Sequence, residues 1–122
     1  MIYVLYGQPG SGKTSLGKLL ASHLDTPFII DGDEFRRMFS NTNFEKSGRE
    51  DNIRAANTVA TYISKVHSID VIQALVNPYE RLRAEVRANN SQVIEILLES
   101  DRDLRRGHHV DDAPFHPPFY LN

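Results

Sequence analysis

The sequence predicts an α/β protein, a three-layer α/β/α sandwich built on a parallel sheet of four or five strands. Strand-like and helix-like segments alternate along the 122 residues, which is typical of a parallel sheet covered by helices. Residues 2–6 (IYVLY) are apolar without alternation, as in a strand buried on both faces. A glycine-rich turn follows directly. Because a chain of this length fits one domain, we expect residues 1–122 to form a single domain.

The first half of the chain supplies two strands and two helices. Residues 13–24 predict a helix, in which the apolar residues recur at helical spacing. These residues are Leu16, Leu19, Leu20 and Leu24. Residues 28–30 predict the second strand, and residues 34–39 a short helix after the Asp-Gly-Asp sequence that ends it. Residues 40–46 are polar and predict a loop.

The second half continues the alternation. Residues 47–66 predict a long helix, with Ser47 and Glu50 spaced as a capping box. Its expected buried stripe is Ile53, Ala56, Ala60 and Ile63. Residues 69–76 predict the third strand. Asn77 and Pro78 predict the cap and first residue of another helix, with Leu82 and Val86 facing inward. Residues 93–98 predict the fourth strand, and the polar, proline-containing residues that follow predict a loop or lid at about 100–118.

Composition excludes several classes of function. The net charge of −2 gives no indication of nucleic acid or anionic membrane as a partner. The absence of cysteine excludes disulfides, zinc–thiolate sites and cysteine nucleophiles. No apolar run approaches the roughly 20 residues that span a bilayer, and no basic segment precedes the first apolar run. A cytoplasmic location is therefore expected.

Residues 7–14 (GQPGSGKT) match the phosphate-binding loop pattern G-x-x-x-x-G-K-[ST] at every fixed position. The glycines allow backbone N–H groups to surround a phosphate, and the dipole at the start of the following helix favours an anion. Lys13 is expected to reach the β- and γ-phosphates of ATP, and the Thr14 hydroxyl to ligate Mg²⁺. The pattern lies between a predicted strand and a predicted helix, which is the context of a P-loop NTPase fold. The predicted nucleotide-binding residues here are Gly7, Gly10, Ser11, Gly12, Lys13, Thr14 and Ser15.

Asp31 and Asp33 lie after the second strand, at the sheet edge where open parallel sheets bind ligands. Asp33 is the predicted acceptor of the proton from the attacking hydroxyl, and is also expected to hold Mg²⁺ through water. Lys13 and Asp33 are thus the predicted catalytic residues. A simpler interpretation, compatible with the first, is that Asp33 caps the following helix.

The segment Asp31-Gly32-Asp33-Glu34-Phe35-Arg36 and the spacing of Phe44, Arg49 and Asn52 resemble the adenylylsulfate kinase (APS kinase) family. The resemblance covers about two thirds of the chain. It implies that Asp31, Asp33, Arg36, Arg49 and Asn52 bind an anionic nucleotide substrate, adenosine 5′-phosphosulfate, while Phe44 stacks on its adenine and the backbone of Val76 contacts it. Arg49 and Asn52 also share one face of a helix start on spacing alone. The alternative for Arg49 is a solvated helix residue.

The sequence departs from the family pattern in two regions. Asn77 and Glu80 stand where the pattern has serine and arginine, and a plain helix start is the alternative interpretation of residues 77–80. The lid is shorter than in the family and lacks lysine, so Arg102 and Arg105 are expected to contact ATP in its place, with Arg106 a third option. An open fourth strand would favour a dimer contact, so a homodimer is one expected assembly. His108 and His109 do not have the spacing of a metal site.

The resemblance implies an ATP- and Mg²⁺-dependent kinase that phosphorylates the 3′-hydroxyl of adenosine 5′-phosphosulfate. Two other hypotheses remain. The chain is a kinase for another nucleotide or small phosphorylated metabolite, or it is a nucleotide-binding module without transfer activity. The short lid supports the last hypothesis, because a lid excludes water and completes a kinase site.

Overall fold

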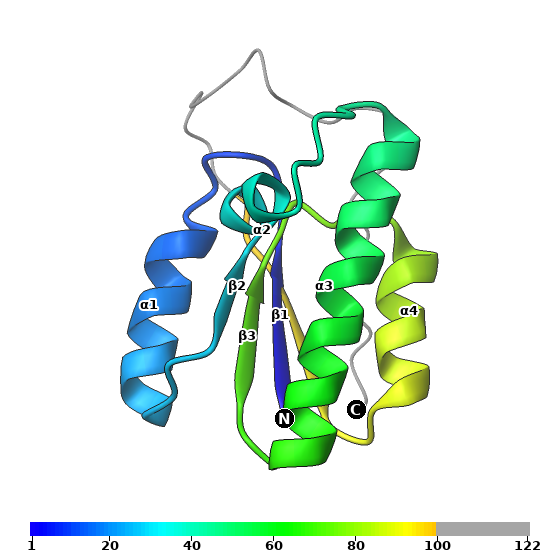
Figure 1. The fold of residues 1–122 in the computed structure, drawn as a ribbon. Coiled ribbons are helices and arrows are strands. Elements are labelled where there is room, and N and C mark those ends of the chain that lie inside the picture. Colours follow the sequence, from blue (N-terminus) through cyan, green and yellow to red (C-terminus); the bar gives the residue numbers. More distant parts are fainter. Residues whose placement is uncertain (100–122) are drawn as a thin grey trace.

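Four parallel strands form the central layer of the fold, as the computed structural model, which describes residues 1–99, shows (Figure 1). The strands are β1 (Ile2–Tyr6), β2 (Ile29–Asp31), β3 (Val71–Ala74) and β4 (Val93–Leu97). Their spatial order is β2-β3-β1-β4, so β1 lies inside the sheet and pairs on both sides, with Ile2 opposite Val71 and Val93. In the part of the chain described, β2 and β4 are the edges.

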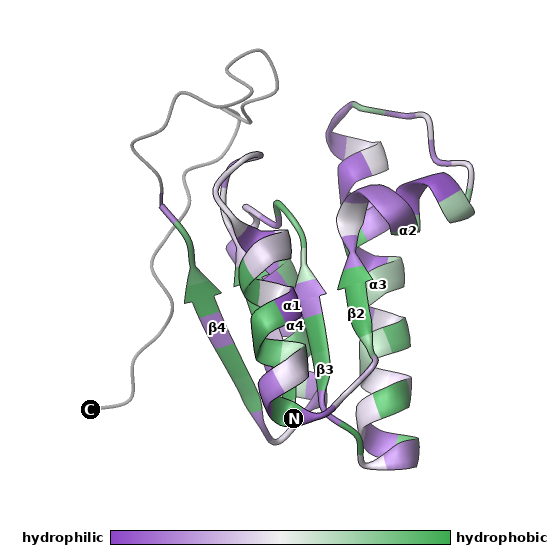
Figure 2. Ribbon diagram, turned by 90° about the vertical axis from the view of Figure 1, so that its left-hand side faces the viewer, coloured by the Kyte–Doolittle hydropathy of each residue, from purple (hydrophilic) through white to green (hydrophobic). Residues whose placement is uncertain are grey.

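Helices cover both faces of this sheet. Helix α1 (Lys13–Leu24) lies on one face, and α3 (Lys46–His67) and α4 (Glu80–Asn89) lie on the other (Figure 1). The short helix α2 (Gly32–Met38) lies at the carboxyl ends of the strands, next to the loop between β1 and α1. The arrangement confirms the predicted three-layer α/β/α sandwich, and the strands are largely apolar along their length (Figure 2).

Each face of the sheet has its own apolar core. Alternate residues of β1 point to opposite faces, as the pleat of a strand requires. Val4 packs with Ala56 and Ala60 of α3, whereas Leu5 packs with Ala21 of α1. On α4, Leu82 and Val86 are also buried, as predicted, and each such side chain contributes about 1.5–3 kcal/mol on burial.

Two predicted helix starts are wrong. Helix α3 begins at Lys46 with Glu45 as its N-cap, and no side chain caps it. Glu50 does not fold back to the helix start, because Arg81 of α4 pairs with its carboxylate. Helix α4 begins at Glu80, so Asn77 is not its cap. Asn77 instead adopts a left-handed backbone (φ 50°) and is buried. The residue before a proline is disfavoured from the right-handed helical region.

Helix α1 has the predicted bounds, whereas one expectation about α2 is wrong. On α1, Leu16 and Leu20 pack toward the sheet beside the buried Gly17 and Ala21, and Leu19 is 70% exposed. Small residues on this face bring α1 close to the strands. Helix α2 is capped by Asp31 rather than Asp33, since the Asp31 side chain accepts hydrogen bonds from the backbone N–H groups of Asp33 and Glu34. No helix within residues 1–99 is both long and apolar enough to cross a membrane.

Candidate active site at the carboxyl ends of the strands

The loop between β1 and α1 has the backbone of an anion-binding turn. Gly10 and Gly12 adopt positive φ angles of 83° and 99°, which L side chains rarely adopt. Gly12 is the N-cap of α1, so Lys13, Thr14 and Ser15 form the first turn of that helix. Backbone N–H groups at a helix start have no partner within the helix, and with the helix dipole they favour a phosphate. The loop therefore has the backbone conformation, and the position at the start of a helix, that phosphate binding requires.

Lys13 is the buried cation of this loop. Its Nζ donates to the carbonyl oxygens of Gly7 (3.0 Å) and Gln8 (2.8 Å), and to the Ser11 hydroxyl at 3.3 Å. Only 8% of the residue is exposed. The ammonium group is thus held inside the curve of the loop, which places a positive charge where a phosphate would be bound.

A carboxylate from β2 meets the first turn of α1. The Thr14 hydroxyl donates to Oδ2 of Asp31 at 2.8 Å, while Oδ1 of Asp31 caps α2. A hydroxyl and a carboxylate at this distance are hard oxygen donors of the kind that Mg²⁺ prefers. The sequence predicted that Thr14 ligates Mg²⁺ and that Asp33 holds the ion through water. In the structure the carboxylate that contacts Thr14 directly is that of Asp31. Asp33, on the first turn of α2, is exposed.

Three of the predicted acceptor-site residues form one wall beside α2. The Arg36 guanidinium lies over the Phe44 ring, 4.7 Å from its centroid, and donates to the carbonyl oxygen of Asn43 at 2.7 Å. Arg49, from the first turns of α3, donates through Nη1 to the carbonyl oxygen of Phe44 at 2.9 Å. The Phe44 ring is 71% exposed. Two arginines and an exposed aromatic ring therefore stand together, which suits a ligand with both anionic groups and a flat base.

Three further residues link the elements around the wall: Asn52, Val76 and Tyr79. The Asn52 amide donates to the carbonyl oxygen of Gly32 at the long distance of 3.4 Å, joining α3 to the start of α2. The Val76 carbonyl accepts from the N–H of Gly7 at 3.1 Å, so the segment that follows β3 supports the phosphate-binding loop. Tyr79 is 95% buried, and its hydroxyl accepts from Nε of Arg49 at 3.1 Å. The sequence predicts no role for Tyr79. The signal that could have found it is its place in the Asn-Pro-Tyr segment that follows β3.

The arginines of the wall influence one another electrostatically. Partial burial lowers the pKa of Arg36, the nearby carboxylate of Asp33 raises it, and the positive charge of Arg49 lowers it again, leaving a net decrease. The guanidinium stays charged at neutral pH because the ordinary pKa of arginine is far above 7. Two positive charges that repel each other would be stabilised by an anion bound between them.

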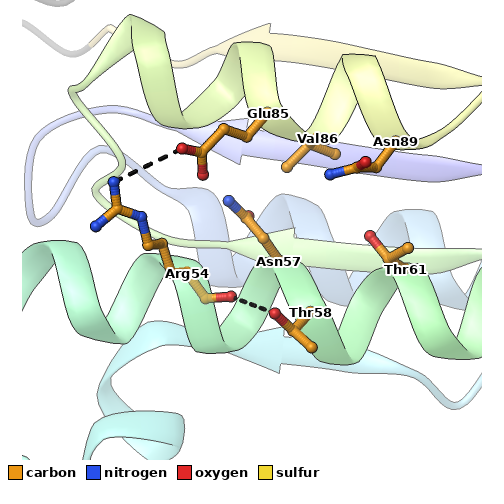
Figure 3. A pocket seen from close by; sticks show the side chains of 7 residues that line it. All are labelled: Arg54, Asn57, Thr58, Thr61, Glu85, Val86 and Asn89. Atoms are coloured by element: carbon orange, nitrogen blue, oxygen red, sulfur yellow. Dashed lines mark hydrogen bonds and ion pairs between the residues drawn. The ribbon is translucent and has the colours of Figure 1, made fainter.

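A groove elsewhere on the described part of the chain lies away from these residues. It has a volume of about 320 Å³ and runs between α3 and α4 (Figure 3). At one end Arg54 pairs with Glu85 at 3.6 Å, and Asn57 lies deeper, with its amide donating to the Leu82 carbonyl at 3.3 Å. None of the predicted site residues lines it. The loop, the Asp31 carboxylate and two arginines instead lie toward the carboxyl edge of the sheet, which makes that edge the candidate site.

Arg102, Arg105 and Arg106, the lid at about 100–118, His108 and His109 lie outside the described residues. Residues 1–99 contain no group of three histidine, aspartate or glutamate side chains arranged to hold a metal ion. Any magnesium at the Thr14–Asp31 position would thus be held by these few protein oxygens together with water and the phosphates of a nucleotide, as is usual for Mg²⁺.

The fold and the loop define the chain as a P-loop NTPase-type protein. The sequence model of the adenylylsulphate kinase family matches residues 1–111. The chain belongs to this family. A search of curated protein sequences finds no match.

Several solved kinases share this architecture. The APS kinase CysC of Mycobacterium tuberculosis, solved in complex with AMPPNP and APS, superposes with a TM-score of 0.76 at 21% identity, over 96% of this chain and 82% of that one. A hexameric APS kinase from Thiobacillus denitrificans gives 0.68 at 29% identity, over 93% of this chain and 24% of that one. A gluconokinase from Sinorhizobium meliloti 1021 gives 0.64 at 20% identity, over 88% and 66%. The family, rather than these distant identities, shows that the chain is a kinase.

Proposed function

We propose that the chain transfers the γ-phosphoryl group of ATP to the 3′-hydroxyl of adenosine 5′-phosphosulfate. One observation carries the proposal: Arg36 of α2 and Arg49 of α3 both contact Phe44, and α2 lies next to the phosphate-binding loop (Figure 1). The arginines would bind the phosphate–sulfate group of the acceptor, and Phe44 would stack on its adenine. The family supports phosphotransfer, while the choice of acceptor rests on this wall.

The reaction would require little covalent chemistry from the protein. The hydroxyl oxygen attacks the γ-phosphorus, the bond to the β–γ bridging oxygen breaks, and ADP leaves. Asp33, exposed at the start of α2, would accept the proton of the hydroxyl. Lys13 and the N–H groups of the loop would stabilise charge that develops on the phosphate oxygens. Mg²⁺, held by Thr14 and Asp31, would supply further neutralisation of the phosphates.

Calorimetric titration of adenosine 5′-phosphosulfate in the presence of Mg-ADP tests the acceptor. We expect binding in the micromolar range that Arg49→Ala weakens by about 1.5–3 kcal/mol, the usual size of a hydrogen bond to a charged group. Arg54→Ala is the matched control, because Arg54 lies on the same helix but pairs with Glu85 in the groove between α3 and α4. Transfer of labelled γ-phosphate to the acceptor would then measure the reaction itself.

A second acceptor class has one observation in its favour. Glu80, which stands where the family pattern has arginine, pairs with Arg83 and Arg87 of its own helix. A site without that arginine would suit a smaller or differently charged acceptor. Binding of ADP without any binding of adenosine 5′-phosphosulfate would favour this class, and thermal-shift measurements with other small phosphorylated metabolites would then identify the acceptor.

A further inference from the structure

Arg83 of α4 is a fully buried guanidinium that none of the preceding functions uses. Its Nη1 donates to the carbonyl oxygen of Asn77 at 2.7 Å, and its Nε donates to Oε1 of Glu95 on β4 at 3.1 Å. The guanidinium also lies over the ring of Tyr6, 4.1 Å from its centroid. Its side chain is 0% exposed. One side chain therefore joins α4 to β1, to β4 and to the turn after β3.

The charge of Arg83 is balanced within a cluster of four side chains. Glu80 accepts from Nη2 of Arg83 at 2.9 Å. Arg87 donates to the second oxygen of Glu95 at 2.6 Å, and also to Glu80. Two arginines thus share two glutamates. Buried ion pairs are weak stabilisers, since well-packed apolar residues often serve a fold equally well, so stability alone gives little reason for this cluster.

The contacts of Arg83 flank the first hydrogen bond of the phosphate-binding loop. Tyr6 directly precedes Gly7, whose N–H donates to the carbonyl oxygen of Val76 at 3.1 Å. Asn77, whose carbonyl Arg83 holds, directly follows Val76. Arg83 therefore contacts the residue before Gly7 and the residue after Val76, the two residues that share this hydrogen bond. The path of the loop as it leaves β1 depends on where Tyr6 and Asn77 lie.

We infer that Arg83 is a positioning residue for the phosphate-binding loop. By holding the Asn77 carbonyl and the Tyr6 ring at the same time, it keeps Gly7 and Val76 in register, so that the loop is formed before a nucleotide arrives. Preorganisation of this kind strengthens binding because less conformational entropy is lost on association. The inference rests on the proposed role of the loop in binding ATP, and adds the residue that sets its geometry.

Arg83→Lys tests this inference, with Arg81→Lys as the matched control. Lysine keeps the charge that Glu95 needs, but lacks the planar fork that reaches a carbonyl and two carboxylates together. Arg81 lies two residues earlier on the same helix, and pairs at the surface with Glu50. Two quantities are measured in each protein: hydrogen exchange of the Gly7 amide, and the dissociation constant of Mg-ADP.

In Arg83→Lys, we expect the exchange rate of the Gly7 amide and the dissociation constant of Mg-ADP each to rise about tenfold. The exchange rate of the Leu75 amide, which donates to the carbonyl oxygen of Leu5, should stay nearly unchanged. Arg81→Lys should change neither. Equal acceleration of the Gly7 and Leu75 amides would show a merely structural role and overturn the inference, as would an unaltered Mg-ADP affinity in folded Arg83→Lys.

Glu95→Gln provides a second test should Arg83→Lys fail to fold. Glutamine removes the ionic charge, but its amide oxygen still accepts from Arg83, so the guanidinium stays on Asn77 and Tyr6. We expect lower stability with a less than twofold change in Mg-ADP affinity and in Gly7 exchange. A tenfold change in either quantity would overturn the inference. If the natural protein did not bind Mg-ADP, the proposed function would fail, whereas Gly7 exchange would still decide the role of Arg83.

Discussion

Asp31 uses its two carboxylate oxygens for two different purposes. Oδ1 accepts from the N–H groups of Asp33 and Glu34 and so caps α2, while Oδ2 accepts from the Thr14 hydroxyl. The structural role as a helix cap and the proposed role in holding Mg²⁺ therefore meet in one side chain. The two roles can be separated, because asparagine caps a helix as well as aspartate but carries no charge.

We predict that Asp31→Asn keeps the free energy of unfolding near that of the natural protein, whereas Asp31→Ala lowers it by about 1 kcal/mol through loss of the cap. In both variants Mg²⁺ should no longer strengthen ADP binding, because the carboxylate charge is gone. Denaturant unfolding and ADP titrations with and without Mg²⁺ measure the two effects. An Asp31→Asn protein that retains the magnesium effect would show that the ion does not depend on Asp31.

Gly48 is the second residue whose identity matters. An alanine in the middle of a helix normally stabilises it by about 1 kcal/mol relative to glycine. At position 48, however, a Cβ would lie 1.9 Å from the carbonyl oxygen of Asn43, in the loop that carries Phe44. The helix preference of alanine would therefore raise the free energy of unfolding, whereas the steric clash would lower it.

We predict that Gly48→Ala destabilises the protein by about 1–3 kcal/mol, as overpacked sites do. It should also weaken acceptor binding, since the loop before α3 must shift. Ser47→Ala, at the exposed neighbouring position, is the control. It adds no atom near the Asn43 carbonyl and removes one hydrogen bond, from the Asn43 amide to the Ser47 hydroxyl at 3.0 Å, so it should cost no more than about 1 kcal/mol. Thermal unfolding of the two variants provides the comparison, and a stabilised Gly48→Ala would contradict the geometry of the loop.

The sequence was sufficient to predict the order of the strands and helices, but not the helix ends. It also grouped Arg36, Phe44 and Arg49, which lie in contact in the structure. The apolar run of β1 and the loop pattern locate the nucleotide site because both depend on neighbours in sequence. Spacing alone does not show which carboxylate of Asp31 and Asp33 faces Thr14. The Ser47–Glu50 cap is wrong for a similar reason, because Arg81, thirty-one residues from Glu50, pairs with its carboxylate. Contacts between residues far apart in the sequence determine which side chain caps a helix and which carboxylate faces Thr14.

At the level of helices and strands, the charge cluster between α4 and β4 should depend on pH. The pKa of Glu80 lies below its ordinary value: partial burial raises it, but hydrogen bonds and charge from Arg87 and Arg83 lower it more. A carboxyl group with a lowered pKa in the folded state stabilises the fold above its unfolded pKa, and this contribution is lost as the pH falls through the folded pKa.

We therefore predict that the free energy of unfolding decreases as the pH falls below the ordinary glutamate pKa of about 4.3, and that Glu80→Gln shows a smaller decrease. The unfolded state binds more protons than the folded state in this range, which gives the sign. Urea unfolding between pH 3 and pH 6 measures the dependence. Glu85→Gln is the control, because Glu85 lies on the same helix and pairs with Arg54 at the surface. Identical profiles for natural protein and Glu80→Gln would refute the assignment.

For the whole molecule, the shared sheet predicts a single unfolding transition. Helices on both faces pack on the same four strands, so residues 1–99 lack a boundary at which one part would unfold alone. Binding to the loop should stabilise this entire unit. At a concentration 100 times its dissociation constant, a ligand adds about 2.7 kcal/mol to the free energy of unfolding.

We predict that Mg-ATP raises the midpoint of that single transition, and that Lys13→Ala abolishes the increase, since Lys13 is the buried cation of the loop. Lys18→Ala, at an exposed position of the same helix, should leave the increase intact. Differential scanning calorimetry measures both. Two resolved transitions, or a Lys13→Ala protein that Mg-ATP still stabilises equally, would contradict the prediction.

The position of β1 inside the sheet also determines when the protein can fold during synthesis. Strand β1 is synthesised before both of its partners, β3 and β4, so Ile2 cannot pair until Val71 and Val93 have been made. A nascent chain that ends before β4 has a central strand with one side unpaired, an exposed template for aggregation. Because such non-local pairing is slow, the phosphate-binding loop gains its final support only after β4 has been translated.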